Sequence, residues 1–211
     1  MEIVFWLAAL SVVYVYFGYP LIVTLLSNVL DRDRQYSCEL QHEPAAQVTV
    51  VIPVHNGTRQ LENKLKNLFE SRYPTELLQA IVVADGSYDD ALVSLCAQFE
   101  SVQLIGYSKR RGKPSALNLA MSRVSTPITV FTDVRQLLHP TAITRLVSRL
   151  EQPGIGAVSG ELVHVDPKTQ EGEKHSLYWR YEKAIRKAES RLHSVPGVTG
   201  ALYAIHTEDY R

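Results

Sequence analysis

The sequence contains few cysteines and no excess of either charge. Among its 211 residues, Lys plus Arg number 22 and Asp plus Glu number 22, so no global electrostatic field favours nucleic acid as a partner. The two cysteines, Cys38 and Cys96, have neither the spacing of metal ligands nor that of a disulfide framework. This low cysteine content is typical of a reduced, cytosol-facing protein. With a hydrophobic fraction of 45%, the composition predicts one ordinary globular domain with an appendage.

Charged side chains are missing altogether between Ile3 and Leu30. As a helix rising ~1.5 Å per residue, this segment more than spans a bilayer core of ~30 Å. A signal peptide has a basic start and a shorter apolar core, and a core helix so long and apolar is rare. We therefore expect residues 1–30 to be a transmembrane anchor, in which Gly18 and Pro20 permit a kink.

Polar residues without periodicity follow this span, and we interpret residues 31–47 as a linker. Arg32 and Arg34 directly follow the apolar segment, whereas no basic residue precedes it. By the positive-inside rule, the chain after the anchor is expected on the cytoplasmic side of the membrane. The remaining residues, 48–211, are expected to form the globular domain of an integral membrane protein with a single N-terminal span.

Short apolar runs alternate with helical patterns through this domain. The first run is rich in β-branched residues, as is typical of a buried strand. Strands are expected at Val48–Pro53, Ala80–Ala84, Val102–Gly106, Pro127–Thr132, Ile155–His164 and Ala201–Ile205. Helices are expected at Gln60–Ser71, Gly112–Val124, Thr141–Leu150 and Tyr178–Leu192. A further helix is expected directly after Asp89, which can act as its N-cap. This alternation predicts an α/β fold with a mainly parallel sheet flanked by helices.

The helix expected at Tyr178–Leu192 has an apolar stripe and basic residues mostly off that stripe. Such a helix either lies on a membrane surface or packs on the domain with its basic face in solvent. The sequence leaves both interpretations open.

Polar side chains end several of the expected strands. If the strands are parallel, their carboxyl ends lie along one edge of the sheet, where open α/β sheets bind ligands. Asp85 follows the second strand and could accept hydrogen bonds from a base or a ribose, while Gly86 allows close backbone approach. The alternative is a plain turn, since Asp-Gly is common turn chemistry.

Basic residues precede the helix expected at Gly112–Val124. The stretch Lys109–Lys113 brings cations close to the free amides of a helix start, which is typical of a phosphate site. A P-loop does not fit, because five residues separate Gly106 from Gly112 instead of four, and this speaks against an ATPase. A solvated basic loop is the alternative for the first two residues of the stretch.

Asp133 ends the fourth strand. A carboxylate in this position could hold a divalent cation that bridges a diphosphate, because Mg²⁺ and Mn²⁺ prefer oxygen ligands. The alternative is an aspartate that caps a helix or a turn.

Six motifs in this order resemble membrane-bound family 2 glycosyltransferases of the processive-synthase-like group, which have the GT-A nucleotide-sugar fold. The resemblance covers about Val48 to Ile205. The motifs are Val51-Ile52-Pro53-Val54-His55-Asn56, Ala84-Asp85-Gly86-Ser87, Gly112-Lys113-Pro114-Ser115-Ala116-Leu117-Asn118, Val130-Phe131-Thr132-Asp133, Ala157-Val158-Ser159-Gly160-Glu161-Leu162 and Thr199-Gly200-Ala201-Leu202-Tyr203-Ala204-Ile205.

The resemblance implies transfer of a sugar from a nucleotide-diphosphate sugar, here a UDP-sugar, to an acceptor hydroxyl. The acceptor would be a carbohydrate or a lipid-linked molecule, as in cell-surface polysaccharide or glycolipid synthesis. It also implies a nucleotide-sugar site near Lys113 and a divalent cation, Mg²⁺ or Mn²⁺, on Asp133 as the first aspartate of a D-x-D element. The residues implied for the uracil and ribose are Pro53, Val54, His55, Asn56 and Asp85, and Gly86 and Ser87 are expected in the same nucleotide-sugar site.

Two departures from the family pattern affect the expected chemistry. Position 135 is Arg135 instead of the second aspartate of D-x-D, so metal ligation would rest on Asp133, and Arg135 could approach a phosphate.

The family also carries an acidic pair, whose carboxylate acts as the acceptor base, beyond the strand that matches Ala201–Ile205. Glu208-Asp209 comes almost directly after this strand, so we interpret it as the start of a surface segment, with Asp209 as a candidate base. We expect the base beyond Arg211, in a longer enzyme of which this is the front part; the alternative is a membrane-anchored nucleotide-sugar-binding module without turnover.

Overall fold

The structure is a computed structural model that describes residues 1–30, 45–163 and 177–210. These residues belong to two compact units, one formed by Met1–Ser37 with Val163–Gly197 and the other by Cys38–Leu162 with Val198–Arg211. Most of the expected linker and Cys38 lie outside the described residues.

The larger unit is built on a six-stranded mixed sheet with the order β3-β2-β1-β4-β6-β5. Its strands are β1 (Val48–Val54), β2 (Leu78–Asp85), β3 (Val102–Tyr107), β4 (Ile128–Thr132), β5 (Ala157–Ser159) and β6 (Leu202–His206). The first four run parallel to one another, whereas β6 pairs antiparallel with both β4 and β5. β5 therefore runs in the same direction as the first four strands, and the prediction of a mainly parallel sheet is confirmed.

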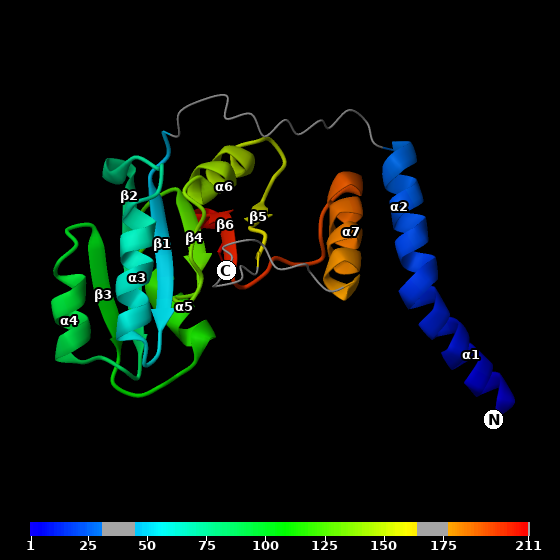
Figure 1. The fold of residues 1–211 in the computed structure, drawn as a ribbon, viewed down its shortest axis with the longest axis horizontal. Coiled ribbons are helices and arrows are strands. Elements are labelled where there is room, and N and C mark those ends of the chain that lie inside the picture. Colours follow the sequence, from blue (N-terminus) through cyan, green and yellow to red (C-terminus); the bar gives the residue numbers. More distant parts are fainter. Residues whose placement is uncertain (31–44, 164–176, 211) are drawn as a thin grey trace. The chain divides into compact units, whose positions relative to one another are not determined.

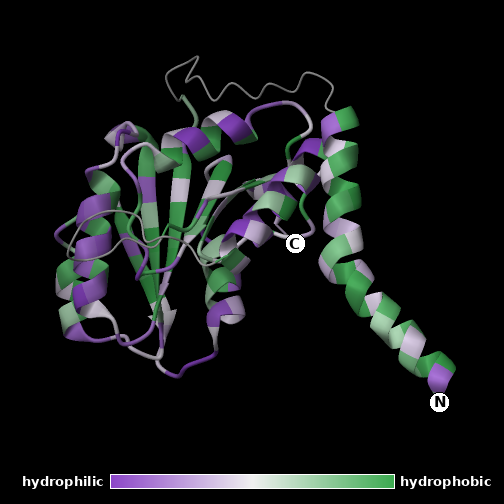
Figure 2. Cartoon of the chain, turned by 45° about the vertical axis from the view of Figure 1, so that its right-hand side comes forward, coloured by the Kyte–Doolittle hydropathy of each residue, from purple (hydrophilic) through white to green (hydrophobic). Residues whose placement is uncertain are grey.

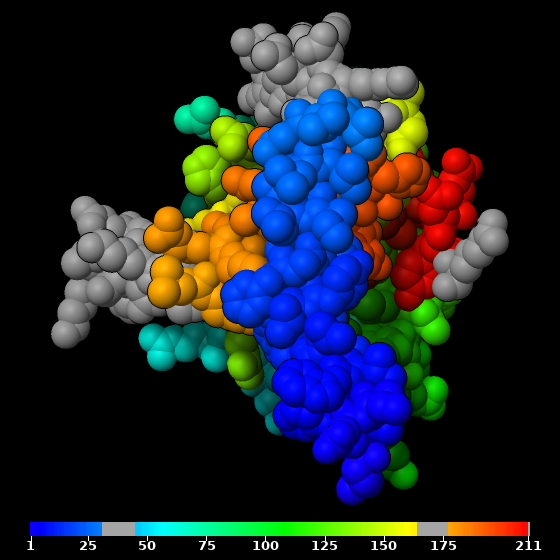
Figure 3. Space-filling model, turned by 90° about the vertical axis from the view of Figure 1, so that its right-hand side faces the viewer, coloured from blue at the N-terminus to red at the C-terminus, as the bar shows by residue number. Residues whose placement is uncertain are grey.

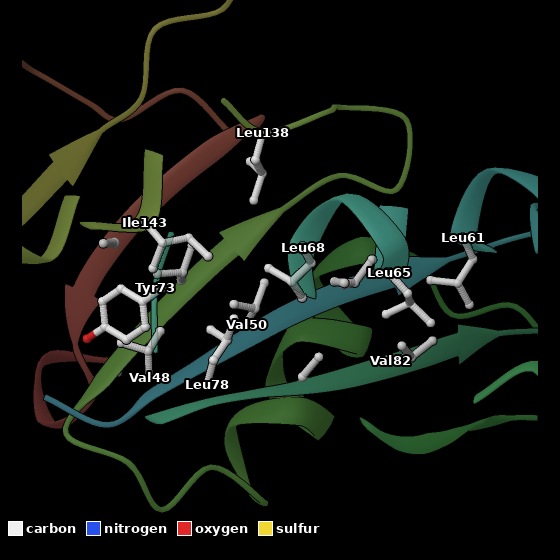
Figure 4. Close-up of a cluster of buried hydrophobic side chains, with 14 of the residues drawn as sticks. Val48, Val50, Leu61, Leu65, Leu68, Tyr73, Leu78, Val82, Leu138 and Ile143 are labelled. Atoms are coloured by element: carbon white, nitrogen blue, oxygen red, sulfur yellow. The ribbon is translucent and has the colours of Figure 1, made fainter. Parts of the chain in front are cut away.

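Helices cover both faces of this sheet (Figure 1). They are α3 (Thr58–Phe69), α4 (Asp90–Cys96), α5 (Lys113–Met121) and α6 (Ala142–Leu150), with short 3-10 helices η2 (Thr75–Leu77) and η3 (Thr207–Asp209). Side chains alternate along β1, so that Val50 and Ile52 join the core under α3, α4 and α6, while Val51 joins the core under α5. Figure 4 shows the first of these cores, where the leucines of α3 meet the strands.

Two element boundaries show why these residues start and stop where they do. Asp89 caps α4, as predicted, because its carboxylate accepts a hydrogen bond from the Leu92 N–H at 2.8 Å. The strand expected at Ile155–His164 is shorter than predicted, covering only Ala157–Ser159. It pairs with β6 on one side only and is flanked by Gly156 and Gly160, which add no side chain to a core; His164 lies outside the described residues.

The smaller unit contains a long apolar helix and α7 (Leu177–Leu192). The apolar helix consists of α1 (Glu2–Val13), a π-helical turn η1 (Tyr14–Gly18) and α2 (Tyr19–Leu30). Its 29 residues are long and apolar enough to cross a membrane by length and composition, and Figure 2 shows apolar residues along most of it. The π-helical turn lies next to Pro20, where a regular α-helix would lose a hydrogen bond.

Within this unit, α7 packs along α2 and buries Pro20, Val23 and Ser27 on one side of that helix (Figure 3). The Tyr181 hydroxyl donates to the carbonyl oxygen of Tyr16 at 2.5 Å, which is the oxygen that Pro20, having no N–H, does not bond. α7 thus has a partner that the sequence did not indicate, namely the apolar helix itself.

Candidate functional site

The carboxyl ends of β1, β2, β4 and β5 lie at one edge of the sheet, because these strands run in the same direction. The antiparallel β6 brings its amino end to that edge, and α5 begins there. The expectation that the polar strand ends share an edge is confirmed. The residues at this edge all belong to the larger unit.

His55 connects the end of β1 to the end of β2. Its Nδ1 lies 2.6 Å from the carbonyl oxygen of Asp85, so Nδ1 carries the proton and Nε2 of a neutral ring is an acceptor. Asn56 follows with φ of 50°, a left-handed conformation that Asn tolerates better than most residues. The chain therefore turns sharply as it leaves β1. The side chains of His55 and Asn56 are exposed, Val54 is buried and Pro53 is partly buried.

Asp85 holds the loop in front of α5. Its two carboxylate oxygens accept hydrogen bonds from the N–H groups of Arg111, at 2.6 Å, and Gly112, at 2.9 Å. The residue is only 5% exposed. The sequence predicted an anion at this basic loop, and in the structure the protein's own carboxylate bonds two of the loop's amides. Any contact of Asp85 with a nucleotide has to use the remaining lone pairs of these oxygens.

Gly86 makes the close backbone approach that the sequence predicted, although to the protein itself. It has φ of +77°, and a Cβ atom added there would lie 2.6 Å from the backbone nitrogen of Arg110. Its N–H donates to the carbonyl of Tyr107 at 3.1 Å, and the Ser87 hydroxyl lies 3.5 Å from the carbonyl oxygen of Val54. The turn after β2 is therefore packed directly on the loop that Asp85 holds.

Lys113 and Asp133 form an ion pair at the centre of this edge. The Lys113 Nζ lies 2.6 Å from Asp133 Oδ1 and donates to the carbonyl of Gly200 at 2.9 Å. Both side chains remain about 40% exposed, at 41% and 39%, and Asp133 is fixed further by its N–H, which donates to the carbonyl of Ala201 at 3.3 Å. The structure thus brings together two residues that the sequence motifs indicated separately, one for the diphosphate and one for the metal.

The donor set at this edge fits a divalent cation that shares its ligands with a substrate. Among the described residues, no group of three or more His, Cys, Asp or Glu side chains could enclose a metal ion, and Arg135 is exposed on the loop after β4. Mg²⁺ commonly binds through one or two carboxylates together with phosphate oxygens and waters. Asp133 meets this minimum, so the residues present fit a cation that arrives with a diphosphate.

Asp209 lies away from this site. β6 runs antiparallel to β4, so its carboxyl end and η3 stand at the opposite edge of the sheet, where the Thr207 N–H donates to the carbonyl of Pro127 at 2.9 Å. The sheet therefore does not bring Asp209 together with Asp85, Lys113 and Asp133. The interpretation of Glu208-Asp209 as a surface segment agrees with the exposure of both side chains.

Sequence reasoning missed Lys64, a lysine of α3 that is fully buried. Its Nζ donates to Thr132 Oγ1 at 2.9 Å and to the carbonyl of Gln136 at 2.5 Å, on either side of Asp133. Burial lowers the pKa of Lys64 to about 7, and the nearby charge of Asp133 opposes this shift. The signal was available, because Lys64 shares the helical face of Leu61, Leu65 and Leu68, where a charge is unexpected.

The sheet, its covering helices and the polar edge define a GT-A glycosyltransferase fold. The chain is similar to the structure of a mannosyltransferase from Pyrobaculum calidifontis in complex with GDP-Man and Mn²⁺, with a TM-score of 0.72 and 26% sequence identity, over 95% of this chain and 55% of that one. Residues 49–210 match the model of glycosyl transferase family 2, and the chain belongs to that family.

Two relatives have similar sequences over part of their length. An N-acetylglucosaminyltransferase of Mesorhizobium japonicum is 31% identical over 125 residues, which are 57% of this chain and 29% of that protein. A glycosyltransferase of Haloferax volcanii is 24% identical over 123 residues, again 57% of this chain and 40% of that protein. The chain thus spans less than half the length of each of these two relatives.

Proposed function

We propose that the chain is the donor-binding part of a glycosyltransferase, which takes a sugar from a UDP-sugar and transfers it to an acceptor hydroxyl. The Lys113–Asp133 pair at the carboxyl edge of the sheet carries this proposal, because a cation and a carboxylate side by side suit the diphosphate and the divalent cation of a nucleotide sugar. The family, and a structural neighbour that contains a nucleotide sugar and Mn²⁺, support it.

Each part of the edge has a role in this proposal. The loop Pro53–Asn56 and the turn Asp85–Ser87 hold the uracil and ribose, with the Asp85 carboxylate also keeping the loop before α5 in place. Lys113 faces the diphosphate, and the exposed Arg135, two residues after Asp133, adds a second cation. Asp133 would hold Mg²⁺ or Mn²⁺, which stabilises the charge of the leaving diphosphate when bound. The base that deprotonates the acceptor is assigned to no described residue.

The membrane is part of the proposal. The helix Glu2–Leu30 crosses a bilayer, and the larger unit works on its cytoplasmic side on a carbohydrate or lipid-linked acceptor of cell-surface polysaccharide or glycolipid synthesis. The length and composition of the helix support this assignment, as does its partner α7, whose mixed basic and aromatic character suits the membrane interface.

The proposal is tested by calorimetric titration of the detergent-solubilised protein with UDP in the presence of Mn²⁺. We expect binding, and a loss of about tenfold or more in affinity for Asp133→Asn, because the amide removes the charge that attracts the cation. Asp209→Asn is the control, since that aspartate lies at the opposite edge, and it should bind like the wild type. The proposal fails if UDP does not bind, or if Asp133→Asn binds as the wild type does. GDP titrated in parallel decides the nucleobase.

A binding module without turnover is the second candidate, and Arg135 in place of a second carboxylate favours it. Hydrolysis or transfer from a UDP-sugar that disappears in Asp133→Asn would rule it out. Binding of UDP with no turnover in the presence of acceptor extracts would favour it.

A further inference from the structure

The segment that follows β4 is tied to α3 by polar side chains of that helix, the buried Lys64 and the partly buried Asn67. Lys64 bonds Thr132 and Gln136, which stand one residue before and three residues after Asp133. The Gln136 N–H in turn donates to the carbonyl of Asp133 at 3.2 Å. The ammonium group of Lys64 therefore joins the two ends of the tight turn that contains Asp133.

Asn67 repeats this arrangement one turn later on the same helix. Its side-chain amide donates to the carbonyl of Leu138 at 3.0 Å, and its oxygen accepts from the Leu138 N–H at 2.7 Å. Leu138 is itself buried in the core beneath α3 (Figure 4). Lys64 and Asn67 together fix both halves of the segment 132–138.

Asp133 consequently lies between two lysines that come from opposite faces of the sheet. Lys113, on α5, contacts its carboxylate directly, whereas Lys64, on the α3 side, holds the backbone on which that carboxylate stands. Taking an ammonium group out of water is costly. A leucine or methionine would fill the same space on α3 without this cost, so packing alone does not account for the lysine.

We propose that Lys64, with Asn67, is a positioning residue that sets the place of the Asp133 carboxylate for a divalent cation and a nucleotide diphosphate without touching either of them. The ligands named here rest on the proposed function, whereas the positioning of the 132–138 segment does not. Lys66 offers a matched control, because it lies two residues further on the same helix, is exposed, and pairs only locally with Glu62 at 2.7 Å.

The first test is hydrogen exchange of the ligand-free protein, comparing Lys64→Met and Lys66→Met with the wild type. We expect amides of the segment 133–138 to exchange at least about tenfold faster in Lys64→Met, with the rest of α3 and the sheet unchanged, and no change in Lys66→Met. Lys64→Leu, which likewise has no donor group, serves as a second variant if Lys64→Met does not fold. Exchange in this segment that stays at the wild-type rate in a folded Lys64 variant overturns the proposal, whether or not any nucleotide binds.

The second test separates positioning from general weakening of the site. Titrations with UDP, with and without Mn²⁺, should show that Lys64→Met weakens the Mn²⁺-dependent affinity by about tenfold and leaves metal-free binding unchanged. Equal losses with and without Mn²⁺ would contradict a role at Asp133. If the wild type binds no UDP while the segment is loosened in Lys64→Met, the positioning stands and the proposed function fails.

Discussion

At the scale of single residues, we expect Lys113 and a divalent cation to compete for the Asp133 carboxylate. In the structure the Lys113 Nζ lies 2.6 Å from Asp133 Oδ1, so a cation that approaches Asp133 meets a like charge. A diphosphate would reverse this effect, because its negative charge attracts both cations. The two ligands should therefore bind together far better than the metal binds alone.

Lys113→Met should change metal binding and nucleotide binding in opposite directions. Without the competing ammonium, Mn²⁺ alone should bind several-fold more tightly, whereas UDP with Mn²⁺ should bind about tenfold more weakly because a phosphate contact is lost. Electron paramagnetic resonance of free Mn²⁺ and calorimetry of UDP measure the two affinities. A Lys113→Met protein in which both affinities fall, or neither changes, would show that Lys113 does not share Asp133 with the metal.

The depressed pKa of Lys64 should make stability depend on pH. Burial lowers this pKa from its ordinary value of 10.5 to about 7 in the folded protein, so the unfolded chain binds more protons between these two values. The free energy of unfolding should therefore rise with pH across this window, by up to about 1.4 kcal/mol per pH unit. Lys64→Met lacks this contribution. The free energy of unfolding of the wild type minus that of the variant should therefore increase by about 2 kcal/mol from pH 7 to pH 9.

Denaturant titration followed by circular dichroism, in detergent, measures that difference at each pH. The thiol of Cys96 and the hydroxyl of Tyr73 have pKa values raised by burial, to about 11 and about 12. Both groups are present in the wild type and in Lys64→Met, so their contributions to the free energy of unfolding cancel in the difference. A difference that stays constant from pH 7 to pH 9 would mean that Lys64 is not the buried, desolvated amine described here.

Residue types at strand ends were predictable from the sequence, whereas their contacts were not. Asp85, Lys113 and Asp133 stand out because polar residues interrupt buried runs. Asp85 bonds two backbone amides, and Lys113 bonds Asp133. Both contacts depend on the conformation of the loop before α5, which the periodicity of the sequence does not encode. The spacing of the leucines predicts α3 but assigns no role to Lys64, which lies on the same face.

At the scale of elements, the turn after β2 and the loop before α5 behave as one packed body. Gly86 contacts Arg110, while Asp85, one residue earlier, bonds the next two backbone amides of the same loop. A side chain at position 86 would push the loop away from the carboxylate that holds it. The start of α5, and with it Lys113, depends on this packing.

Gly86→Ala should lower stability and UDP affinity more than Gly154→Ala, although both glycines have nearly the same positive φ, +77° and +80°. A Cβ at Gly154 meets nothing within 4 Å, so that change should cost only the left-handed strain, about 1 kcal/mol. At Gly86 the clash with Arg110 should add at least about 1 kcal/mol and weaken UDP binding. Thermal unfolding and calorimetry of both variants make the comparison; equal effects would show that the close approach is unimportant.

Element positions followed from sequence patterns more reliably than element lengths and partners. The apolar runs located the strands because burial on both faces of a parallel sheet requires them. The run at 155–164 predicted too long a strand, because its length is limited by pairing with β6 alone. The partner of α7 was not predictable, since it is an apolar helix more than 140 residues earlier in the chain.

At the scale of the whole molecule, the order of strands determines which residues share the site. The antiparallel β6 lies between β4 and β5, so it brings Gly200 to Lys113 and carries Asp209 to the far edge. The alternation of strands and helices predicted the parallel part of the sheet, but the direction of the last strand follows from tertiary pairing. Asp209, which follows β6 closely in the sequence, therefore lies at the opposite edge of the sheet from Lys113 and Asp133.

A crystallographic or cryo-electron-microscopy structure of the protein with UDP and Mn²⁺ tests most directly whether this edge of the sheet binds the donor. We expect Mn²⁺ bound to a carboxylate oxygen of Asp133, with the diphosphate beside Lys113 and the nucleoside between the loop Pro53–Asn56 and the turn Asp85–Ser87. Mn²⁺ or UDP located elsewhere, with the Lys113–Asp133 pair intact, would contradict it.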